Sequence, residues 1–153
     1  MAAAESELRP RIRVAALILI DGNVVLTRHL KDGRRYYLLP GGGVGYRETL
    51  EAALLREVAE ETGLEVDLGR PVLISDTIDP SGERHAVNIV FLAEPTGGAI
   101  TESPADPRVE AVDLVPPSDL ASLDFRPPIT DALVEVLDDP TATARYLGSL
   151  FTP

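Results

Sequence analysis

The sequence predicts an α/β protein in which helices form layers around a β-sheet. Three observations indicate this fold class. The chain has 153 residues, and single domains most often contain about 100–150 residues. Short apolar segments typical of strands dominate the sequence, and one segment has the length and periodicity of a helix. Elements of these two kinds bury their apolar faces by packing as layers.

The first part of the chain has the pattern of short strands joined by turns. Apolar runs at 14–20 and 24–27 flank the sequence Asp-Gly-Asn, which strongly favours a hairpin. A second turn is expected at 31–33, and a short strand at 36–39 is followed by a proline and a cluster of glycines. We expect these glycines to shape the chain leading into a helix.

The strongest helix signal covers residues 49–62, and Gly63 suits the position after its last residue. The other elements are interpreted from turn residues and apolar runs: strands at 72–77, 86–93 and 109–115, a turn at 79–82, a loop at 95–108, and a helix at 127–137 with Pro128 in its first turn. We expect one domain over residues 1–153, with peripheral tails at 1–9 and 138–153 and a short helix near 144–150.

Composition and charge exclude several classes of protein. The formal net charge is −11, whereas non-specific binding to nucleic acid polymers or anionic membranes requires a basic surface. No apolar run approaches the roughly 20 residues of a membrane-spanning helix, and the first residues lack the pattern of a secretory signal. Cysteine is absent, which excludes disulfides, a thiolate metal site and a cysteine nucleophile. We expect a cytoplasmic protein that binds neither membranes nor nucleic acid polymers.

The helix at 49–62 carries a stripe of carboxylates beside its apolar face. At about 100° per residue, Glu57, Glu60 and Glu61 lie on one side of the helix. Like charges at this spacing destabilise a helix by roughly 0.2–0.5 kcal/mol per pair. A hard divalent cation would offset this repulsion, because Mg²⁺ and Mn²⁺ prefer carboxylate ligands. On the helix alone, a solvated face of glutamates explains the stripe equally well.

The residues around this helix follow a longer pattern. Gly42 is followed by five residues, Glu48 and seven more residues, and then by Arg-Glu-Val-Ala-Glu-Glu-Thr-Gly-Leu at 56–64. This string, residues 42–64, resembles the signature of the Nudix hydrolase family, Gly-x5-Glu-x7-Arg-Glu-U-x-Glu-Glu-x-Gly-U, in which U is a bulky aliphatic residue. Every fixed position matches. The preceding Tyr-Leu-Leu-Pro-Gly-Gly at 37–42 also resembles the usual start of that signature.

The resemblance implies a fold, an activity and a set of site residues. The fold would be an α/β/α sandwich with a mixed β-sheet, in which the signature forms a loop–helix–loop. The activity would be hydrolysis of the diphosphate bond in a nucleoside diphosphate linked to another moiety X, dependent on Mg²⁺ or Mn²⁺. Carried over by position, the metal ligands would be Glu57, Glu60, Glu61 and the carbonyl of Gly42, with Arg56 orienting the carboxylates and Glu48 supporting the site as a further ligand, through water or in base chemistry.

Further residues are candidates for contacts with substrate. The loop before the strand at 109–115 contains Glu102 and Asp106, at a place from which several family members take an additional acid. Phosphate contacts and base stacking have as candidates Arg28, Arg34, Arg35, Arg47, Tyr36 and Tyr37. Solvated arginines and core tyrosines are the alternative interpretation. His29 and His85 have no partner pattern, so we assign both to structure.

The substrate is only weakly encoded in the sequence. ADP-ribose pyrophosphatases of the family often carry a proline about fifteen or sixteen residues beyond the signature, where this chain has Pro80, although Pro80 also suits the turn at 79–82. We expect a small-molecule substrate resembling ADP-ribose, in a protein compatible with a homodimer. The alternatives are a nucleoside triphosphate pyrophosphohydrolase of the sanitising type, a non-catalytic module that senses a nucleotide, and an interaction domain with a structural acidic helix.

Overall fold

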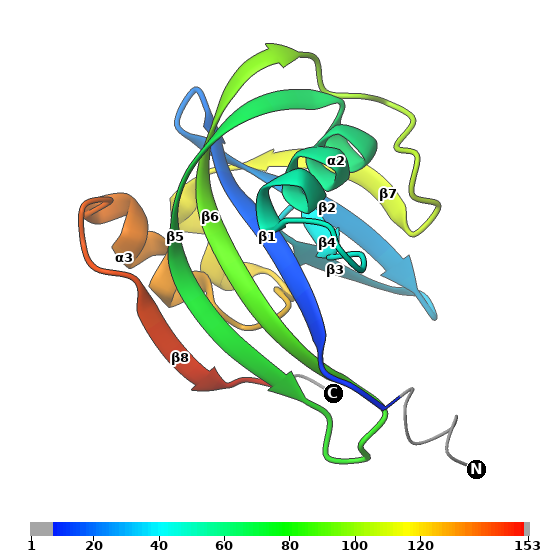
Figure 1. Ribbon diagram of the computed structural model, residues 1–153. Coiled ribbons are helices and arrows are strands. Elements are labelled where there is room, and N and C mark those ends of the chain that lie inside the picture. The colour runs from blue at the N-terminus through cyan, green and yellow to red at the C-terminus, as the bar shows by residue number, and fades with distance from the viewer. Residues whose placement is uncertain (1–7, 152–153) are drawn as a thin grey trace.

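The computed structural model describes residues 8–151, in which the strands form one sheet with an α-helix on each side (Figure 1). The strands are β1 (Arg11–Ile20), β2 (Asn23–Lys31), β3 (Arg34–Leu38), β4 (Gly41–Gly43), β5 (Leu64–Ile78), β6 (His85–Gly98), β7 (Val109–Val115) and β8 (Arg145–Ser149). The helices are α2 (Leu50–Thr62), α3 (Thr130–Asp138) and a 3-10 helix, η1 (Pro117–Ser122). No helix among the described residues is long and apolar enough to cross a membrane. Most of the tail expected at 1–9 lies outside the described residues.

The sheet is mixed, as the resemblance implies. Its strands follow the order β3-β2-β1-β6-β5-β8, and β4 and β7 join it by pairing with β1 and β2. β1 runs parallel to β6 and β5 runs parallel to β8, whereas the other paired strands are antiparallel. The predicted α/β class is therefore confirmed.

Two Asp-Gly turns connect the first three strands. Asp21 and Gly22 join β1 to β2, and Asp32 and Gly33 join β2 to β3. All four residues have positive φ angles, from 51° to 79°, which is the backbone that a tight two-residue hairpin turn requires. Both predicted turns are confirmed, and the strands beside them are longer than their apolar runs because backbone pairing continues into polar residues.

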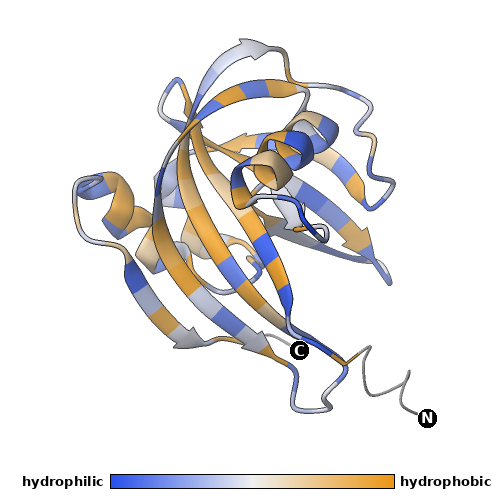
Figure 2. Cartoon of the chain, viewed as in Figure 1, coloured by the Kyte–Doolittle hydropathy of each residue, from blue (hydrophilic) through white to orange (hydrophobic). Residues whose placement is uncertain are grey.

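Alternating side chains of β1 contribute to two hydrophobic cores, one on each face of the sheet. Val14, Ala16 and Ile18 pack in the core that includes α2, whereas Leu17 packs in the core that includes α3. Figure 2 shows that the middle of β1 is apolar and that hydrophilic and hydrophobic residues alternate at its start. The two cores make the molecule the expected α/β/α sandwich.

The glycine cluster that leads toward the helix forms a short strand. Gly41–Gly43 form β4 and pair antiparallel with β1. A Cβ atom at Gly41 would lie 2.0 Å from the carbonyl oxygen of Val14, so glycine is needed for this close approach. The chain is thereby held against β1 just before the loop that leads to α2.

Several boundaries in the second half differ from the prediction. β5 and β6 form a long antiparallel pair that reaches Gly98, so the loop predicted at 95–108 begins only after that residue. α3 begins at Thr130, and Pro128 is not in its first turn. The physical reason is that Pro127 precedes another proline, and a residue before proline is disfavoured in the helical region.

The segment predicted as a short helix near 144–150 is instead the strand β8. It runs parallel to β5, with Leu73 opposite Arg145, and Leu147 and Leu150 pack against the core that includes α3. The prediction is wrong because the partner that makes this segment a strand lies far away in the sequence.

Candidate active site

Two caps and a buried face fix the position of α2. The side-chain oxygen of Thr49 accepts a hydrogen bond from the backbone N–H of Ala52 at 3.0 Å. At the other end, Gly63 adopts the left-handed conformation with a φ of 80°. Leu54 and Val58 are fully buried against the sheet. The helix therefore has one orientation, and its carboxylates have defined places.

The three carboxylates of the predicted stripe differ in burial. Glu61 is only 4% exposed, because it continues along the buried face of α2 one turn after Val58. The side chain of Glu57 is 15% exposed, whereas that of Glu60 is 48% exposed. Glu57 and Glu61 thus face the interior, and Glu60 lies at the rim.

Arg56 connects Glu48 to the stripe. Its Nε and Nη2 atoms donate to the two carboxylate oxygens of Glu48 at 2.9 and 2.8 Å, and its Nη1 atom donates to Glu57 at 2.8 Å. The backbone N–H of Gly45 donates to Glu48 at 2.9 Å. These hydrogen bonds, above all those from Arg56, lower the pKa of Glu48 to about 2. Glu48 is therefore an anion that holds the guanidinium between two carboxylates.

Glu61 lies in an environment that opposes its charge. Burial is the largest cause, and the neighbouring charges of Glu57 and Asp106 add to it, so that the pKa of Glu61 is raised to about 8. Arg13 and the backbone N–H of Gly41 act in the opposite direction but do not compensate. Burial and the neighbouring carboxylates therefore favour the protonated form of Glu61.

This donor set fits a hard divalent cation in its chemistry. Within residues 8–151, no three carboxylate or imidazole side chains converge closely enough to hold a metal ion as they stand, since Arg56 engages Glu57 and Glu60 lies at the rim. A Cβ atom at Gly42 would lie 2.4 Å from the carboxylate carbon of Glu57, so the backbone there comes unusually close to that carboxylate. Carboxylate and carbonyl oxygens in such a cluster are the donors that Mg²⁺ and Mn²⁺ prefer.

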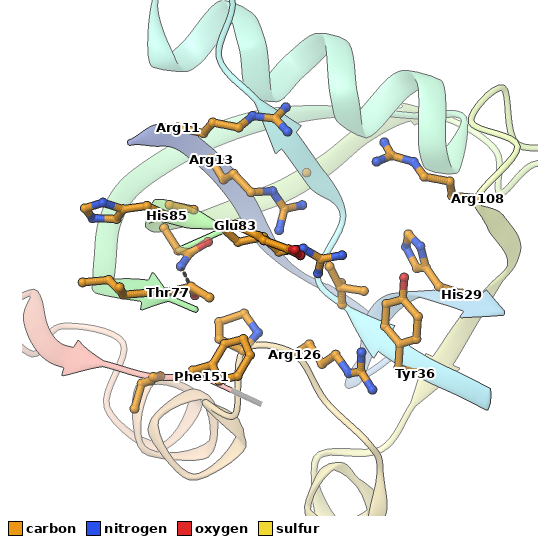
Figure 3. Close-up of a pocket in the computed structure, with 18 of the residues that line it drawn as sticks. Arg11, Arg13, His29, Tyr36, Thr77, Glu83, His85, Arg108, Arg126 and Phe151 are labelled. Atoms are coloured by element: carbon orange, nitrogen blue, oxygen red, sulfur yellow. Dashed lines mark hydrogen bonds between the residues drawn. The ribbon is translucent and has the colours of Figure 1, made fainter. Parts of the chain in front are cut away.

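A pocket of about 840 Å³ opens beside this cluster, and Glu61 lines it. Its walls come from the start of β1, the turn between β5 and β6, strands β2 and β3, and the last described residues at the C-terminus. Figure 3 shows Arg11, Arg13, Arg108 and Arg126 at different places around it. The basic side chains that line it are Arg9, Arg11, Arg13, Lys31, Arg84, Arg108 and Arg126. In a protein with a net charge of −11, this concentration of cations suits a phosphorylated ligand.

The loop after β6 brings Asp106 to the pocket. The backbone N–H of Ala105 donates to the carbonyl of Glu60 at 3.0 Å, which attaches the loop to the end of α2. Asp106 lines the pocket, and its ion pair with Arg108, at 2.8 Å, lowers its pKa. Glu102, the other acid that we considered in this loop, is exposed and is not among the lining residues.

Three other predicted substrate residues lie elsewhere. Arg28 forms an ion pair with Glu110 at 3.1 Å, Arg47 is exposed in the loop before α2 with a φ of 66°, and Tyr37 packs against the core that includes α3. None of the three belongs to the pocket lining that the structure describes. Tyr36 does line the pocket.

Several lining residues were not singled out by the sequence. Arg11 and Arg13 alternate at the start of β1, and this period-two spacing could have placed both on one face of a strand. Arg126 lies before α3 and has no local signal. His29 and His85, which we assigned to structure, also line the pocket.

Comparison with known proteins adds a family to this geometry. The family model described as NUDIX domain matches residues 9–136. The chain is 34% identical to a protein named NAD-capped RNA hydrolase NudC from Deinococcus radiodurans, over 94% of this chain and 50% of that protein. It is also 34% identical to an ADP-ribose pyrophosphatase from Methanocaldococcus jannaschii, over 70% of this chain and 64% of that protein. The chain thus spans about half to just under two thirds of these relatives.

Solved structures share the fold. A NUDIX hydrolase from Nitrosomonas europaea has a TM-score of 0.76 at 18% identity, covering 89% of this chain and 93% of that one. A MutT NUDIX hydrolase from Burkholderia pseudomallei has a TM-score of 0.60 at 31% identity, covering 87% of this chain and 99% of that one. The first likeness shows the fold alone, and the second also extends to the sequence.

Proposed function

This chain belongs to the Nudix hydrolase family, and from that premise we propose that it hydrolyses the diphosphate bond of a nucleoside diphosphate linked to another moiety X. One observation carries the proposal. The buried carboxylate of Glu61 lies at the wall of a pocket lined by arginines. The like charges of Glu57 and Asp106 disfavour its ionisation. A ligand that brings both a divalent cation and a diphosphate would satisfy both halves of this site.

The chain's own residues have distinct roles in this proposal. Glu57, Glu60, Glu61 and the carbonyl of Gly42 would hold Mg²⁺ or Mn²⁺. When bound, the cation would neutralise charge on the diphosphate and polarise the phosphoryl group. Arg56 orients Glu57 through its hydrogen bond at 2.8 Å. Arg11 and Arg13, which lie on β1 and line the pocket, would bind phosphate oxygens.

Glu48 is better suited to positioning than to accepting a proton. A general base works best when its pKa lies near the working pH, and the pKa of Glu48 is lowered to about 2. Both of its carboxylate oxygens also accept hydrogen bonds from Arg56. We therefore assign Glu48 to the support of Arg56 and, through it, of Glu57.

An ADP-ribose-like substrate is slightly favoured. The relative from Methanocaldococcus jannaschii is named an ADP-ribose pyrophosphatase, and Pro80 agrees with that class. The relative from Deinococcus radiodurans is named an NAD-capped RNA hydrolase, so NADH and an NAD-capped RNA are the next substrates to compare. These ligands share a nucleoside diphosphate joined to a second group. Nucleoside triphosphates and nucleotide sensing without turnover remain the alternatives.

The test is a product-release assay with Mg²⁺ and, separately, with Mn²⁺. The panel contains ADP-ribose, NADH, NAD-capped RNA, diadenosine polyphosphates, nucleoside triphosphates and oxidised deoxyguanosine triphosphate. We expect Glu61→Gln to lower kcat by roughly a hundredfold or more, because metal-ion catalysis supplies several kcal/mol of transition-state stabilisation. The matched control is Glu51→Gln, which makes the same change at an exposed position in the first turn of the same helix, and it should retain wild-type activity.

The outcomes separate the candidate functions. Turnover of one diphosphate-linked nucleoside that Glu61→Gln abolishes agrees with the proposal and identifies the substrate class. Turnover of triphosphates alone favours the sanitising alternative. A nucleotide that raises the melting temperature without being hydrolysed under either metal favours a sensor and contradicts the proposal.

A further inference from the structure

His29 is a buried imidazole in the pocket that the proposed metal chemistry does not use. It lies on β2, it is 7% exposed, and it lines the same pocket as Glu61 (Figure 3). Its Nε2 atom lies 3.1 Å from the side-chain oxygen of Thr27. Burial lowers the pKa of His29, so the ring is neutral at neutral pH and carries a single N–H.

The neighbours of Thr27 decide which ring nitrogen carries that proton. The Thr27 oxygen also lies 3.2 Å from the carbonyl oxygen of Leu38. A carbonyl oxygen can only accept, so the one hydroxyl proton of Thr27 is directed to Leu38. The contact between Thr27 and His29 is then a hydrogen bond only if His29 Nε2 donates. In that tautomer His29 Nδ1 carries a lone pair and no proton.

The ring is held in place beside the pocket. His29 stacks on Tyr36 with 5.2 Å between ring centroids, and the guanidinium of Arg126 lies 4.4 Å from the centre of the Tyr36 ring. Within residues 8–151 the structure gives Nδ1 of His29 no hydrogen-bond partner, and His29 lines the pocket.

This acceptor differs from the arginine and lysine side chains that line the same pocket. Arginine and lysine side chains in the pocket only donate hydrogen bonds, which suits phosphate oxygens. A lone pair on His29 Nδ1 repels a phosphate oxygen and attracts a hydroxyl or an N–H group. The part of the ligand that faces His29 must therefore be a donor and not a phosphate.

We propose that His29 Nδ1 accepts a hydrogen bond from the nucleoside part of the ligand and thereby contributes to substrate specificity, with Thr27 as the positioning residue that selects the tautomer. The donor is a sugar hydroxyl or an N–H of the base. The inference rests on the proposed function only for the choice of nucleotide probes, because the tautomer is a property of the free protein.

The first experiment measures the tautomer directly. The chain has two histidines, so a nitrogen-labelled imidazole spectrum of the free protein contains two ring systems, and the variant His85→Gln assigns them. We expect the His29 ring to be protonated at Nε2 and unprotonated at Nδ1 at neutral pH. A proton on Nδ1 would overturn the inference whatever the protein hydrolyses.

The second experiment measures binding in EDTA, which would suppress the proposed metal-dependent hydrolysis. His29→Phe keeps an aromatic ring beside Tyr36 but removes both nitrogens. We expect it to weaken the binding of ADP-ribose and of AMP about five- to tenfold, the effect of one net hydrogen bond, at an unchanged melting temperature. Thr27→Val should weaken binding in the wild-type background and add nothing in the His29→Phe background.

Nucleotide analogues identify the donor. The analogues compared with AMP are 2′-deoxy-AMP, 3′-deoxy-AMP and the purine nucleotide that lacks the 6-amino group. One analogue should bind wild type and His29→Phe equally, because its missing group is the donor. Equal losses for every analogue, or equal binding of AMP and ADP-ribose to both proteins, would overturn the inference. If these binding differences are observed but the wild-type protein hydrolyses none of the substrates, only the proposed function is contradicted.

Discussion

At the scale of single residues, Glu61 shows how a helix position acquires a chemical property. Its spacing from Val58 places it on the buried face of α2, where it is 4% exposed. There it lies near Glu57 and Asp106, and burial together with these charges raises its pKa to about 8. The same carboxylate on the opposite side of the helix would be an ordinary surface group. The raised pKa of Glu61 can be tested by measuring the free energy of unfolding as a function of pH.

We predict that Glu61 contributes a loss of stability to the metal-free protein as the pH rises from about 4.5 to about 8. The pKa of Glu61 is higher in the folded protein than its ordinary value of 4.5, so folding favours the protonated form. The stabilisation is complete below the unfolded pKa and disappears as the pH passes through the folded pKa, with a slope of about 1.4 kcal/mol per pH unit between these two values. Urea unfolding in EDTA over this pH range measures the effect.

Two comparisons isolate the contribution of Glu61. Glu61→Gln should flatten this part of the pH profile, because an amide does not titrate. Mg²⁺ should restore stability at pH values near 8 to the wild type and not to Glu61→Gln. A wild-type profile in EDTA that matches that of Glu61→Gln would contradict the buried environment of this carboxylate.

At the scale of elements, the two ends of α2 are held by different means. At the start, Thr49 provides a side-chain hydrogen bond to the backbone. At the end, Gly63 provides a left-handed backbone and also close packing, since a Cβ atom there would lie 2.4 Å from the carbonyl oxygen of Ala99. Ala99 belongs to the loop that leads to Asp106, so the end of the helix and the pocket depend on the same glycine.

We predict that Gly63→Ala destabilises the protein more than Thr49→Ala. Loss of the Thr49 cap should cost about 0.5–2 kcal/mol. Gly63→Ala adds the strain of a left-handed alanine, about 1–2 kcal/mol, to a steric conflict with the backbone. The control is Gly22→Ala, at a similar φ of 79° with no atom within 4 Å of the new Cβ, which measures the strain alone. Urea unfolding compares the three, and equal losses for both glycines would contradict the packing argument.

At the scale of the whole molecule, one sheet connects two cores. Residues of β1 alternate between the core that includes α2 and the core that includes α3. Neither helix can therefore lose its packing without exposing one face of the same central strand. This arrangement predicts one cooperative unit rather than two halves of independent stability.

We predict that a cavity beside α3 also weakens α2. Leu133 is fully buried in the core that includes α3, and Leu133→Ala should lower the free energy of unfolding by about 2–5 kcal/mol. The opening free energy that hydrogen exchange gives for the slowest α2 amides should fall by the same amount. Leu114→Ala, at a side chain that is 43% exposed, is the control and should have little effect. Unchanged protection of α2 in Leu133→Ala would show that the halves unfold separately.

Features that depend on neighbours in the sequence were predicted well. The two Asp-Gly hairpins, the helix with Thr49 and Gly63 at its ends, and the carboxylate pattern of the Nudix signature all lie within short segments. Their physics is local, because turn conformation, helix capping and side-chain spacing along one helix are set by residues a few positions apart.

Folding alone brought the rest of the candidate site together. Arg13 on β1, Asp106 in the loop after β6, and Arg126 before α3 come from distant segments and meet in one pocket. β8 is a strand because β5 offers it a pairing edge, and β4 is a strand because glycine lets its backbone approach β1. These features are absent from any local pattern, since pairing partners, burial and the charges facing a buried group exist only once the sheet has formed. The sequence alone therefore determined the family signature and the carboxylates, and tertiary packing determined their burial, their pKa values and the basic pocket beside them.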